Sequence, residues 1–369
     1  MNGKRAGRGA VHCSLFTVYR CRFALYLQPV PRASTFPNVL AVRFSSIGDI
    51  LLTTPLLRAI RQSHPGARVT VLTKREYVPL LSHNPHVHLV LGLAPGRSLL
   101  SLAAELRGDD YSHCLDLHDN LRSRALRLVV PGRWRSYPKH RVARALLIYG
   151  KRNRYRDRRP VAERYFSAAR DLGVTPDGAP PEFFLGAEAG EQVAAWLASV
   201  GWEAETNIVA MAPGAAHATK RWPIEHWRML VDKMVKEGFA VAIVGGPGDV
   251  ALGAALSESG GGRVASSAGV FGLQATGALL HRARALVSGD TGVMHMATGV
   301  GTPVLALFGP TVEAFGFFPY ARQAGVLELP LPCRPCTSQG GPLCPLGHHR
   351  CLVDLHPHTA YEALRRILL

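Results

Sequence analysis

The sequence has no apolar run long enough to cross a membrane as a helix. Such a span needs roughly 18 or more apolar residues, and the most apolar N-terminal stretch, residues 11–30, is interrupted by Arg20 and Arg22. The same arginines break the apolar region that a signal peptide needs, and no clear cleavage site follows. These absences predict a cytoplasmic protein.

Acidic residues are scarce. The 369 residues include 26 Asp or Glu against 43 Lys or Arg, a formal net charge of +17. The excess is local: residues 1–37 hold six basic residues and no acid, and residues 122–164 hold fifteen basic residues and two acids. Such a patch suits nucleic acid, an anionic membrane or a phosphorylated substrate, and a solvated surface is the alternative. No nucleic-acid-reading motif with interleaved aromatic residues accompanies it, which disfavours nucleic acid.

Short tandem repeats are also absent, so a solenoid is not expected. From Asn38 the chain alternates apolar strand-like runs with amphipathic helical stretches, and a second such series begins near Asn207. This βαβ spacing predicts parallel sheets in two Rossmann-like α/β domains. We expect a poorly ordered basic extension at 1–37, an N-terminal, acceptor-side domain at 38–180 and a C-terminal, nucleotide-sugar-binding domain at 181–369.

A polar turn and a carboxylate follow the first strand. The run “NVLAVRF” leads into Ser45, Ser46 and Gly48, and Asp49 stands where an apolar helix begins. One interpretation is helix capping by the carboxylate. The other is chemistry, because ligands of α/β proteins bind at the carboxyl ends of strands.

A second polar strand end lies in the second series, in the stretch “SGDTGVMH”. Asp290, Thr291 and Gly292 precede a helix of small residues that contains His295. Free backbone N–H groups at a helix N-terminus bind anions, and glycine admits a diphosphate closely. An ordinary capped helix start is the alternative.

A basic loop follows the first strand of the second series. In “PGAAHATKRWP”, Lys220 and Arg221 are both candidates for a phosphate contact, and one of them could be merely solvated. We expect both polar strand ends of the second series to face the one around Asp49 across a cleft.

The cysteines are unevenly distributed. Four of the seven cluster near the C-terminus with the spacing C-x2-C-x7-C-x6-C, namely Cys333, Cys336, Cys344 and Cys351. In a cytosolic protein this cluster favours a metal or redox role over disulfides. One structural zinc is our first interpretation, since four thiolates complete a tetrahedral site. An iron–sulfur cluster and free thiols stay open, and His348 or His349 could replace one thiolate.

Three stretches together resemble a known family. “FSSIGDILLTTPLLRAI”, “HATKRWPIEHW” and “GDTGVMHMATGVGTPVLALFGPT” are similar to the signatures of glycosyltransferase family 9, the bacterial lipopolysaccharide heptosyltransferases. The resemblance covers about 38–369. It implies a GT-B fold, in which two Rossmann-like domains face each other across a cleft with a metal-independent site.

The resemblance also implies a reaction. It is the inverting transfer of heptose from ADP-L-glycero-D-manno-heptose to an inner-core, lipid A-linked acceptor, by a cytoplasmic enzyme peripherally associated with the inner membrane. Asp49 matches the general base, and Lys220 matches the lysine that contacts the donor phosphate. No cofactor is implied for catalysis. The other matched positions are Ser45, Ser46 and Gly48 in the acceptor-side loop, and Asp290, Thr291, Gly292 and His295 in the donor-binding sequence.

Some features lie outside the resemblance. Residues 1–37 fall outside the pattern, and the cysteine cluster occurs in some relatives without being needed for transfer. A GT-B glycosyltransferase with another nucleotide sugar or cell-envelope acceptor remains an alternative. An epimerase on the same fold is a further one, although no acid/base partners for it are identified.

Overall fold

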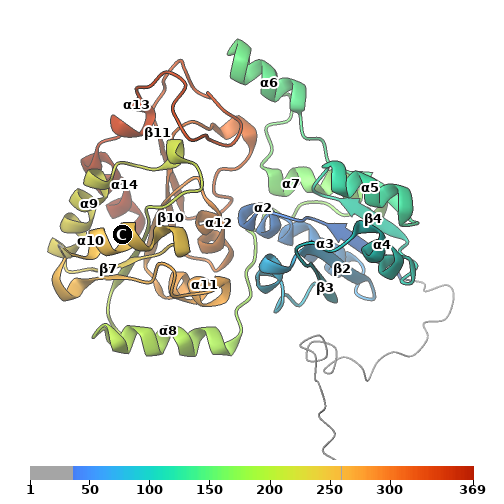
Figure 1. Cartoon of the computed structure of the whole chain (residues 1–369), viewed down its shortest axis with the longest axis horizontal. Coiled ribbons are helices and arrows are strands. Elements are labelled where there is room, and N and C mark those ends of the chain that lie inside the picture. Colours follow the sequence, from blue (N-terminus) through green and yellow to red (C-terminus); the bar gives the residue numbers. More distant parts are fainter. Residues whose placement is uncertain (1–35, 259) are drawn as a thin grey trace, which may run out of the picture. The chain divides into compact units, whose positions relative to one another are not determined.

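The computed structural model describes residues 36–258 and 260–369 (Figure 1). The basic extension expected at 1–37 therefore lies almost entirely outside the described residues. Residues Pro37–Leu369 form one compact unit that contains two parallel β-sheets. This arrangement confirms the predicted α/β class.

The first sheet has five strands in the order β3-β2-β1-β4-β5, all parallel. The strands are β1 Asn38–Val42, β2 Arg68–Lys74, β3 Leu89–Leu93, β4 His113–Asp116 and β5 Arg133–Ser136. The helical elements of this half are α2 Ile47–Leu51, α3 Thr54–Ser63, η2 Arg75–Leu80, α4 Leu99–Arg107, α5 Leu121–Val129, α6 Arg141–Gly150, α7 Val161–Arg164 and η3 Tyr165–Leu172.

The second sheet has six strands in the order β11-β10-β9-β6-β7-β8, again all parallel. The strands are β6 Ile208–Ala212, β7 Ala240–Ile243, β8 Val264–Ser266, β9 Ala285–Gly289, β10 Val304–Phe308 and β11 Ala324–Glu328. The helical elements are α8 Ala187–Ser199, η4 Ala218–Lys220, α9 Ile224–Lys236, η5 Pro247–Asp249, α10 Val250–Ser257, η6 Gly261–Arg263, α11 Leu273–Arg282, α12 Gly292–Gly299, η7 Glu313–Phe315, α13 Arg350–Val353 and α14 Pro357–Leu368.

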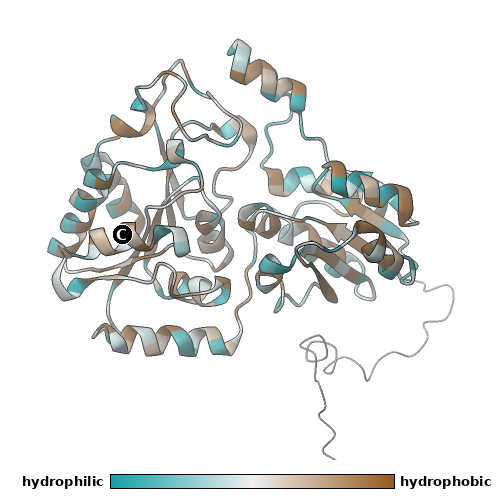
Figure 2. Ribbon diagram, in the orientation of Figure 1, coloured by the Kyte–Doolittle hydropathy of each residue, from teal (hydrophilic) through white to brown (hydrophobic). Residues whose placement is uncertain are grey.

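Alternation along the central strands explains how each sheet is covered on both faces. Successive side chains of a strand point to opposite faces. In β1, Val39 and Ala41 belong to one hydrophobic cluster, whereas Leu40 and Val42 belong to another that includes residues of α4 and α5. Figure 2 shows the hydrophobic residues concentrated along the strands. Central strands buried on both faces therefore appear in the sequence as continuous apolar runs.

One hydrophobic cluster is shared by the two halves. It contains Val39 of β1 together with Ile208 of β6, Leu279 of α11 and Met294 of α12. The two halves therefore share one continuous hydrophobic core.

The expected central strands are all present, and the strands that the sequence did not reveal are short or edge strands. The missed strands are β5, β8 and β11. β5 and β11 contain no fully buried residue, and β8 spans three residues. An edge strand is only half covered, so it lacks the apolar run by which central strands are predicted.

Two short helices from different halves pack directly against each other through glycines. A Cβ atom on Gly48 of α2 would lie 2.3 Å from Cδ2 of His295 in α12. A Cβ atom on Gly292 of α12 would lie 2.7 Å from Cβ of Ile47. Both glycines are therefore required by the close approach of α2 and α12.

This contact generates a prediction about stability. Gly48→Ala should lower the free energy of unfolding by about 1–3 kcal/mol, because the added methyl group overlaps the buried His295 ring. Gly190→Ala is the matched control, since its Cβ would meet nothing within 4 Å in helix α8. That control should stabilise the protein by roughly 0.5–1 kcal/mol through helix propensity. Urea unfolding of both variants measures the difference, and equal effects would contradict the proposed packing role.

Candidate functional site

Asp49 lies in the first turn of α2, but it is not the N-cap residue. Ser46 occupies the N-cap and Asp49 the third helical position. The backbone N–H and the hydroxyl of Ser46 both donate to Oδ2 of Asp49, at 3.2 and 2.8 Å. The carboxylate therefore caps the helix from inside through one oxygen. The cap uses Oδ2 alone, so the cap leaves Oδ1 of Asp49 to other contacts, and a capping role does not exclude a catalytic one.

The second oxygen of Asp49 is held by an arginine. Nη2 of Arg43 lies 2.5 Å from Oδ1 of Asp49, and both side chains are largely buried. Burial opposes ionisation of the carboxyl, but the guanidinium and the Ser46 hydrogen bonds outweigh it, so the pKa of Asp49 is lowered. Arg43 is itself anchored by donation from Nη1 to the carbonyl oxygen of Leu117, at 2.5 Å. Asp49 is therefore a fixed, ionised hydrogen-bond acceptor.

Three cationic or titratable side chains around Asp49 were missed from the sequence. Arg43, His118 and Lys139 follow the carboxyl ends of β1, β4 and β5, which are neighbours in the first sheet. Their positions after strand ends were a usable signal. The order of the strands, which brings them together, was not visible in the sequence.

The environment changes the protonation of two of these groups. Burial, assisted by Arg43 and Lys139, lowers the pKa of His118 to about 4, so its imidazole is neutral near pH 7. Its buried Nδ1 atom has no hydrogen-bond partner among the described residues. Burial and Arg43 also lower the pKa of Lys139 to about 8, although Asp119 and Asp49 oppose that shift. This end of the first sheet thus offers a carboxylate, a neutral imidazole and an ammonium of reduced pKa.

In the second half, Lys220 is paired with Asp290. Nζ of Lys220 lies 2.7 Å from Oδ2 of Asp290 and donates to its backbone carbonyl at 3.2 Å. Thr311 donates its hydroxyl to the same Oδ2 atom at 2.7 Å. The three residues follow the adjacent strands β6, β9 and β10. An ammonium has three donors, so Lys220 retains one for a ligand such as a phosphate.

The neighbouring Arg221 is directed away from this pair. Its Nε atom donates to the carbonyl oxygen of Ala215 at 2.9 Å, within its own loop. Of the two basic candidates in this loop, the structure therefore brings Lys220 to the strand ends.

The predicted residues at the start of α12 take part in packing, and Gly292 does not leave the open space for a diphosphate that the sequence suggested. Thr291 is the N-cap residue, with its hydroxyl 3.0 Å from that of Ser288. Gly292 follows, and the space beside it is occupied by Ile47 rather than left open. The free N–H groups of the first turn remain an anion-binding feature.

His295 connects the two groups of residues. Its ring is buried against Gly48, and its Nδ1 atom has no hydrogen-bond partner among the described residues. Burial lowers the pKa of His295. The carboxylates of Asp290 and Asp49 oppose this shift, and the ammonium of Lys220 adds to it. Charged side chains at the strand ends of both halves therefore influence the pKa of this one imidazole. The sequence-predicted residues of the two halves converge at this point, with half-buried Ser45 at the edge of the acceptor-side loop.

The cysteine-rich loop lies next to the donor side. Burial raises the pKa of Cys336, with smaller contributions from the nearby Cys344 and Cys333, and burial raises the pKa of Cys351 to about 11. All four thiols are free. Across residues 36–258 and 260–369, however, no group of three or more Cys, His, Asp or Glu side chains is placed to hold a metal ion. A zinc site here stays a prediction.

The same loop supports the segments that carry Lys220 and Asp290. Thr219 donates its N–H to the carbonyl oxygen of Gly341 at 3.1 Å, and Nε2 of His349 lies 2.9 Å from the carbonyl oxygen of Thr219. Arg334 donates from Nη2 to the carbonyl oxygen of Thr311 at 2.7 Å. The loop thus braces the residue before Lys220 and the threonine that holds Asp290.

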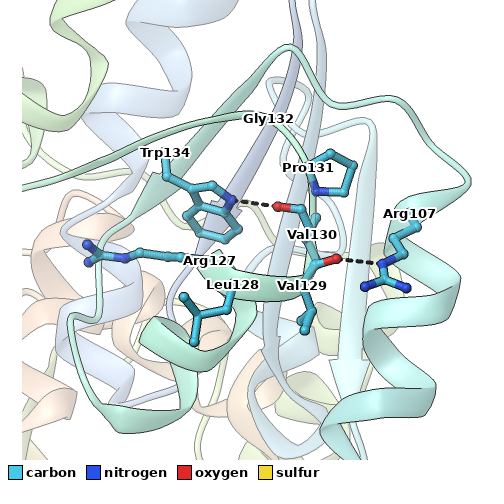
Figure 3. A pocket seen from close by; sticks show the side chains of 8 residues that line it. All are labelled: Arg107, Arg127, Leu128, Val129, Val130, Pro131, Gly132 and Trp134. Carbon is cyan, nitrogen blue, oxygen red and sulfur yellow. Dashed lines mark hydrogen bonds between the residues drawn. The ribbon is translucent and has the colours of Figure 1, made fainter.

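Two pockets in the described part of the chain lie away from this chemistry. A pocket of about 480 Å³ at the end of α5 is lined by Arg107, Arg127, Leu128, Val129, Val130, Pro131, Gly132 and Trp134 (Figure 3). Several of its donors are already used, since Arg107 donates to Val129 and Trp134 donates to Val130. A second pocket, of about 700 Å³, lies between α8 and α11 and is mainly apolar. Neither pocket is lined by Asp49, Lys220 or His295. We therefore locate the candidate site from the grouping of these side chains at the strand ends.

Comparison with known proteins points to one family. The model of Glycosyltransferase family 9 (heptosyltransferase) matches residues 99–346. Lipooligosaccharide heptosyltransferase 2 of Haemophilus influenzae is 25% identical over 355 residues, which cover 90% of this chain and 99% of that protein. The glycosyl transferase family 9 structure from Veillonella parvula has a TM-score of 0.74 at 22% identity, covering 90% of this chain and 97% of that one. The E. coli ADP-heptose lps heptosyltransferase II structure has a TM-score of 0.70 at 24% identity, with 90% and 98% covered.

The environment of Lys139 generates a prediction about its titration. Competitive acetylation followed by mass spectrometry should give Lys139 a midpoint near its lowered pKa of about 8. Asp119→Asn should move the midpoint to lower pH, because Asp119 raises the pKa of Lys139. Exposed Lys236 serves as the internal reference. A Lys139 midpoint at the ordinary value of 10.5 would contradict the buried, Arg43-facing position.

Proposed function

Because the chain belongs to glycosyltransferase family 9, we propose that it transfers heptose from ADP-L-glycero-D-manno-heptose to an inner-core, lipid A-linked acceptor of lipopolysaccharide. The family assignment makes it a glycosyltransferase, and its two Rossmann-like halves form the expected GT-B fold. We further propose inversion at the anomeric carbon and a metal-independent reaction.

One observation carries the proposal. A fixed carboxylate from the first half and an ammonium–carboxylate pair from the second both act on the imidazole of His295, across the contact of α2 with α12. Sugar transfer needs these two functions close together: a group that accepts the proton of the acceptor hydroxyl, and groups that stabilise a leaving diphosphate.

Asp49 would act on the acceptor. Its lowered pKa makes it a weak base toward a free hydroxyl. The hydroxyl becomes acidic as its oxygen bonds to the anomeric carbon, so proton transfer to Asp49 is favourable late in the step. The new carbon–oxygen bond forms as the bond to the donor phosphate breaks, and that electron pair leaves with ADP. The negative charge of Asp49 also stabilises an oxocarbenium-like centre.

Lys220 and the start of α12 would act on the donor. The remaining donor of the Lys220 ammonium and the first N–H groups of α12 can stabilise charge on the departing diphosphate. The pairing with Asp290 holds the ammonium in place before the donor binds. Preorganised charge of this kind needs little rearrangement during the reaction.

The proposed location of the enzyme follows from the kind of acceptor it is proposed to use. No helix of the described part of the chain has the length and apolarity to span a bilayer. A lipid-linked acceptor brings the reaction to a membrane surface, and the fifteen basic residues of 122–164 suit an anionic one. We propose a cytoplasmic enzyme that associates peripherally with the inner membrane and binds no nucleic acid.

The donor sugar and the acceptor can be identified directly from the products. A GT-B enzyme of the same family could use another nucleotide sugar or another cell-envelope acceptor. Mass spectrometry of the products formed from a panel of nucleotide sugars and lipid A acceptors tests this. A product containing heptose on an inner-core acceptor is expected, and exclusive use of another sugar would contradict the proposal.

The role of Asp49 can be tested by removing its basicity. Asp49→Asn should reduce the transfer rate by about 10²–10⁴ while ADP binding is retained. Asp232→Asn, at an exposed carboxylate of α9, is the control and should leave the rate unchanged. Because Arg43 loses its partner, the melting temperature should be measured alongside the rate. Near-normal turnover of folded Asp49→Asn would remove Asp49 as the base.

The role of Lys220 can be separated from that of its neighbour. Lys220→Ala should weaken ADP binding and lower the transfer rate, because the diphosphate loses a charged donor. Arg221→Ala is the matched control, since Arg221 donates to Ala215 within its own loop. Calorimetry with ADP and steady-state rates measure the two effects. Unchanged affinity and rate in Lys220→Ala would exclude it from the site.

Two expectations about metals can be tested on one preparation. Transfer should be as fast with EDTA in the assay as with added magnesium, and strict magnesium dependence would contradict a metal-independent site. Elemental analysis of anaerobically purified protein tests the cysteine loop. A structural zinc predicts about one zinc per chain, and less than about 0.2 zinc or iron per chain would exclude a metal at the four thiols.

A further inference from the structure

Helix α6 exposes an apolar stripe. Val142, Leu146 and Tyr149 are 74%, 42% and 86% exposed. Their spacing of four and then three residues places them on one face of the helix. Figure 2 shows hydrophobic residues along α6. Three large apolar side chains in a row on a helix of 10 residues are unusual for a surface that faces only water.

The other side of α6 is already packed, so the stripe is not a displaced core face. Leu147 and Ile148 are buried in a small cluster with Tyr155 and Phe315. The guanidinium of Arg144 lies over the Phe315 ring, 5.2 Å from its centroid. The helix is therefore held by one face, while the opposite apolar face has no cover in the described part of the chain.

Free cations follow the stripe directly. Arg152, Arg154, Arg156 and Arg158 are exposed, and none forms an ion pair with a carboxylate of residues 36–258 or 260–369. Lys151 differs, since it donates to the carbonyl oxygens of Cys333 and Pro335. An apolar stripe with adjoining unpaired arginines is complementary to an anionic lipid surface, in which phosphates meet acyl chains.

The start of α6 is tied to the proposed acceptor side. Arg141, its first residue, pairs with Asp119 at 2.8 Å, and Lys139 donates to the Asp119 carbonyl oxygen at 3.4 Å. Asp49 contributes to the electrostatic environment of Lys139. A surface that receives α6 would therefore lie near the carboxylate proposed to act on a lipid-linked acceptor.

We propose that α6 is an interfacial membrane-binding helix, with Val142, Leu146 and Tyr149 entering an anionic phospholipid bilayer and the following arginines contacting its phosphates. The proposal deepens the proposed function, on which it rests for the reason why a bilayer is approached at all. The arginines attract the protein at long range, and the apolar stripe holds it by removing hydrocarbon from water.

The test is vesicle co-sedimentation of the full chain without acceptor or donor. A triple variant, Val142→Gln, Leu146→Gln and Tyr149→Gln, should bind phosphatidylethanolamine–phosphatidylglycerol vesicles about tenfold more weakly or worse. Val270→Gln is the control, because Val270 is 60% exposed outside the arginine-rich segment, and it should bind like the parent chain. Replacing Arg152, Arg154 and Arg156 by Gln should weaken binding at low salt and flatten its salt dependence.

A second measurement places the helix in the bilayer. Tyr149→Trp should add fluorescence that brominated phosphatidylglycerol quenches, whereas Val270→Trp should add fluorescence that it does not quench. Full binding by the folded triple variant, or an unquenched Tyr149→Trp signal, would overturn the proposal. Loss of a concentration-dependent dimer in the triple variant, with vesicle binding intact, would instead assign the stripe to a second copy of the chain and would also overturn it.

The outcomes separate this inference from the proposed function. Transfer to a short-chain, water-soluble acceptor should be unchanged in the triple variant, because the stripe is outside the site. If the parent chain binds vesicles through α6 but transfers no heptose, the proposed reaction fails while the membrane surface stands. If it transfers heptose but the triple variant binds vesicles normally, the membrane surface fails while the reaction stands.

Discussion

The close contact between α2 and α12 is the constraint on which the rest of the site depends. Gly48 and Gly292 each leave room for a side chain of the other helix, so the two helices meet with little between them. Each helix follows the carboxyl end of a central strand, β1 or β9, of its own sheet. The contact therefore brings the strand ends of two separate sheets together, and with them Asp49 and Asp290.

Charge is arranged differently on the two sides of this contact. On the first side, Arg43 pairs with the ionised Asp49 and lowers its basicity, and the pKa values of His118 and Lys139 are lowered in the same surroundings. On the second side, the positive charge of Lys220 is matched by Asp290. Both charged pairs are held by hydrogen bonds to fixed backbone, which keeps them in place as substrates enter.

The support of the donor side comes from the cysteine-rich loop. Its backbone and Arg334 hold Thr219 and Thr311, the residues adjacent to the Lys220–Asp290 pair. The sequence analysis treated the cysteine cluster in this loop as a structural site that transfer does not need. In the fold, backbone and side-chain groups of this loop hold the residues next to those proposed to bind the diphosphate.

The sequence by itself determined the fold class, the central strands and the residues at their carboxyl ends. Continuous apolar runs identify strands that are buried on both faces, and polar residues after such runs indicate a ligand site. Tertiary structure alone decided the rest. The half-covered edge strands β5, β8 and β11 carry no such run. Arg43, His118 and Lys139 became part of the site only because sheet order places β1, β4 and β5 side by side. The resemblance had already singled out Lys220 over Arg221, but the physical reason lies in the fold: the loop directs Lys220 to Asp290 and Arg221 to the carbonyl oxygen of Ala215, a difference that adjacent residues of like charge do not show in the sequence.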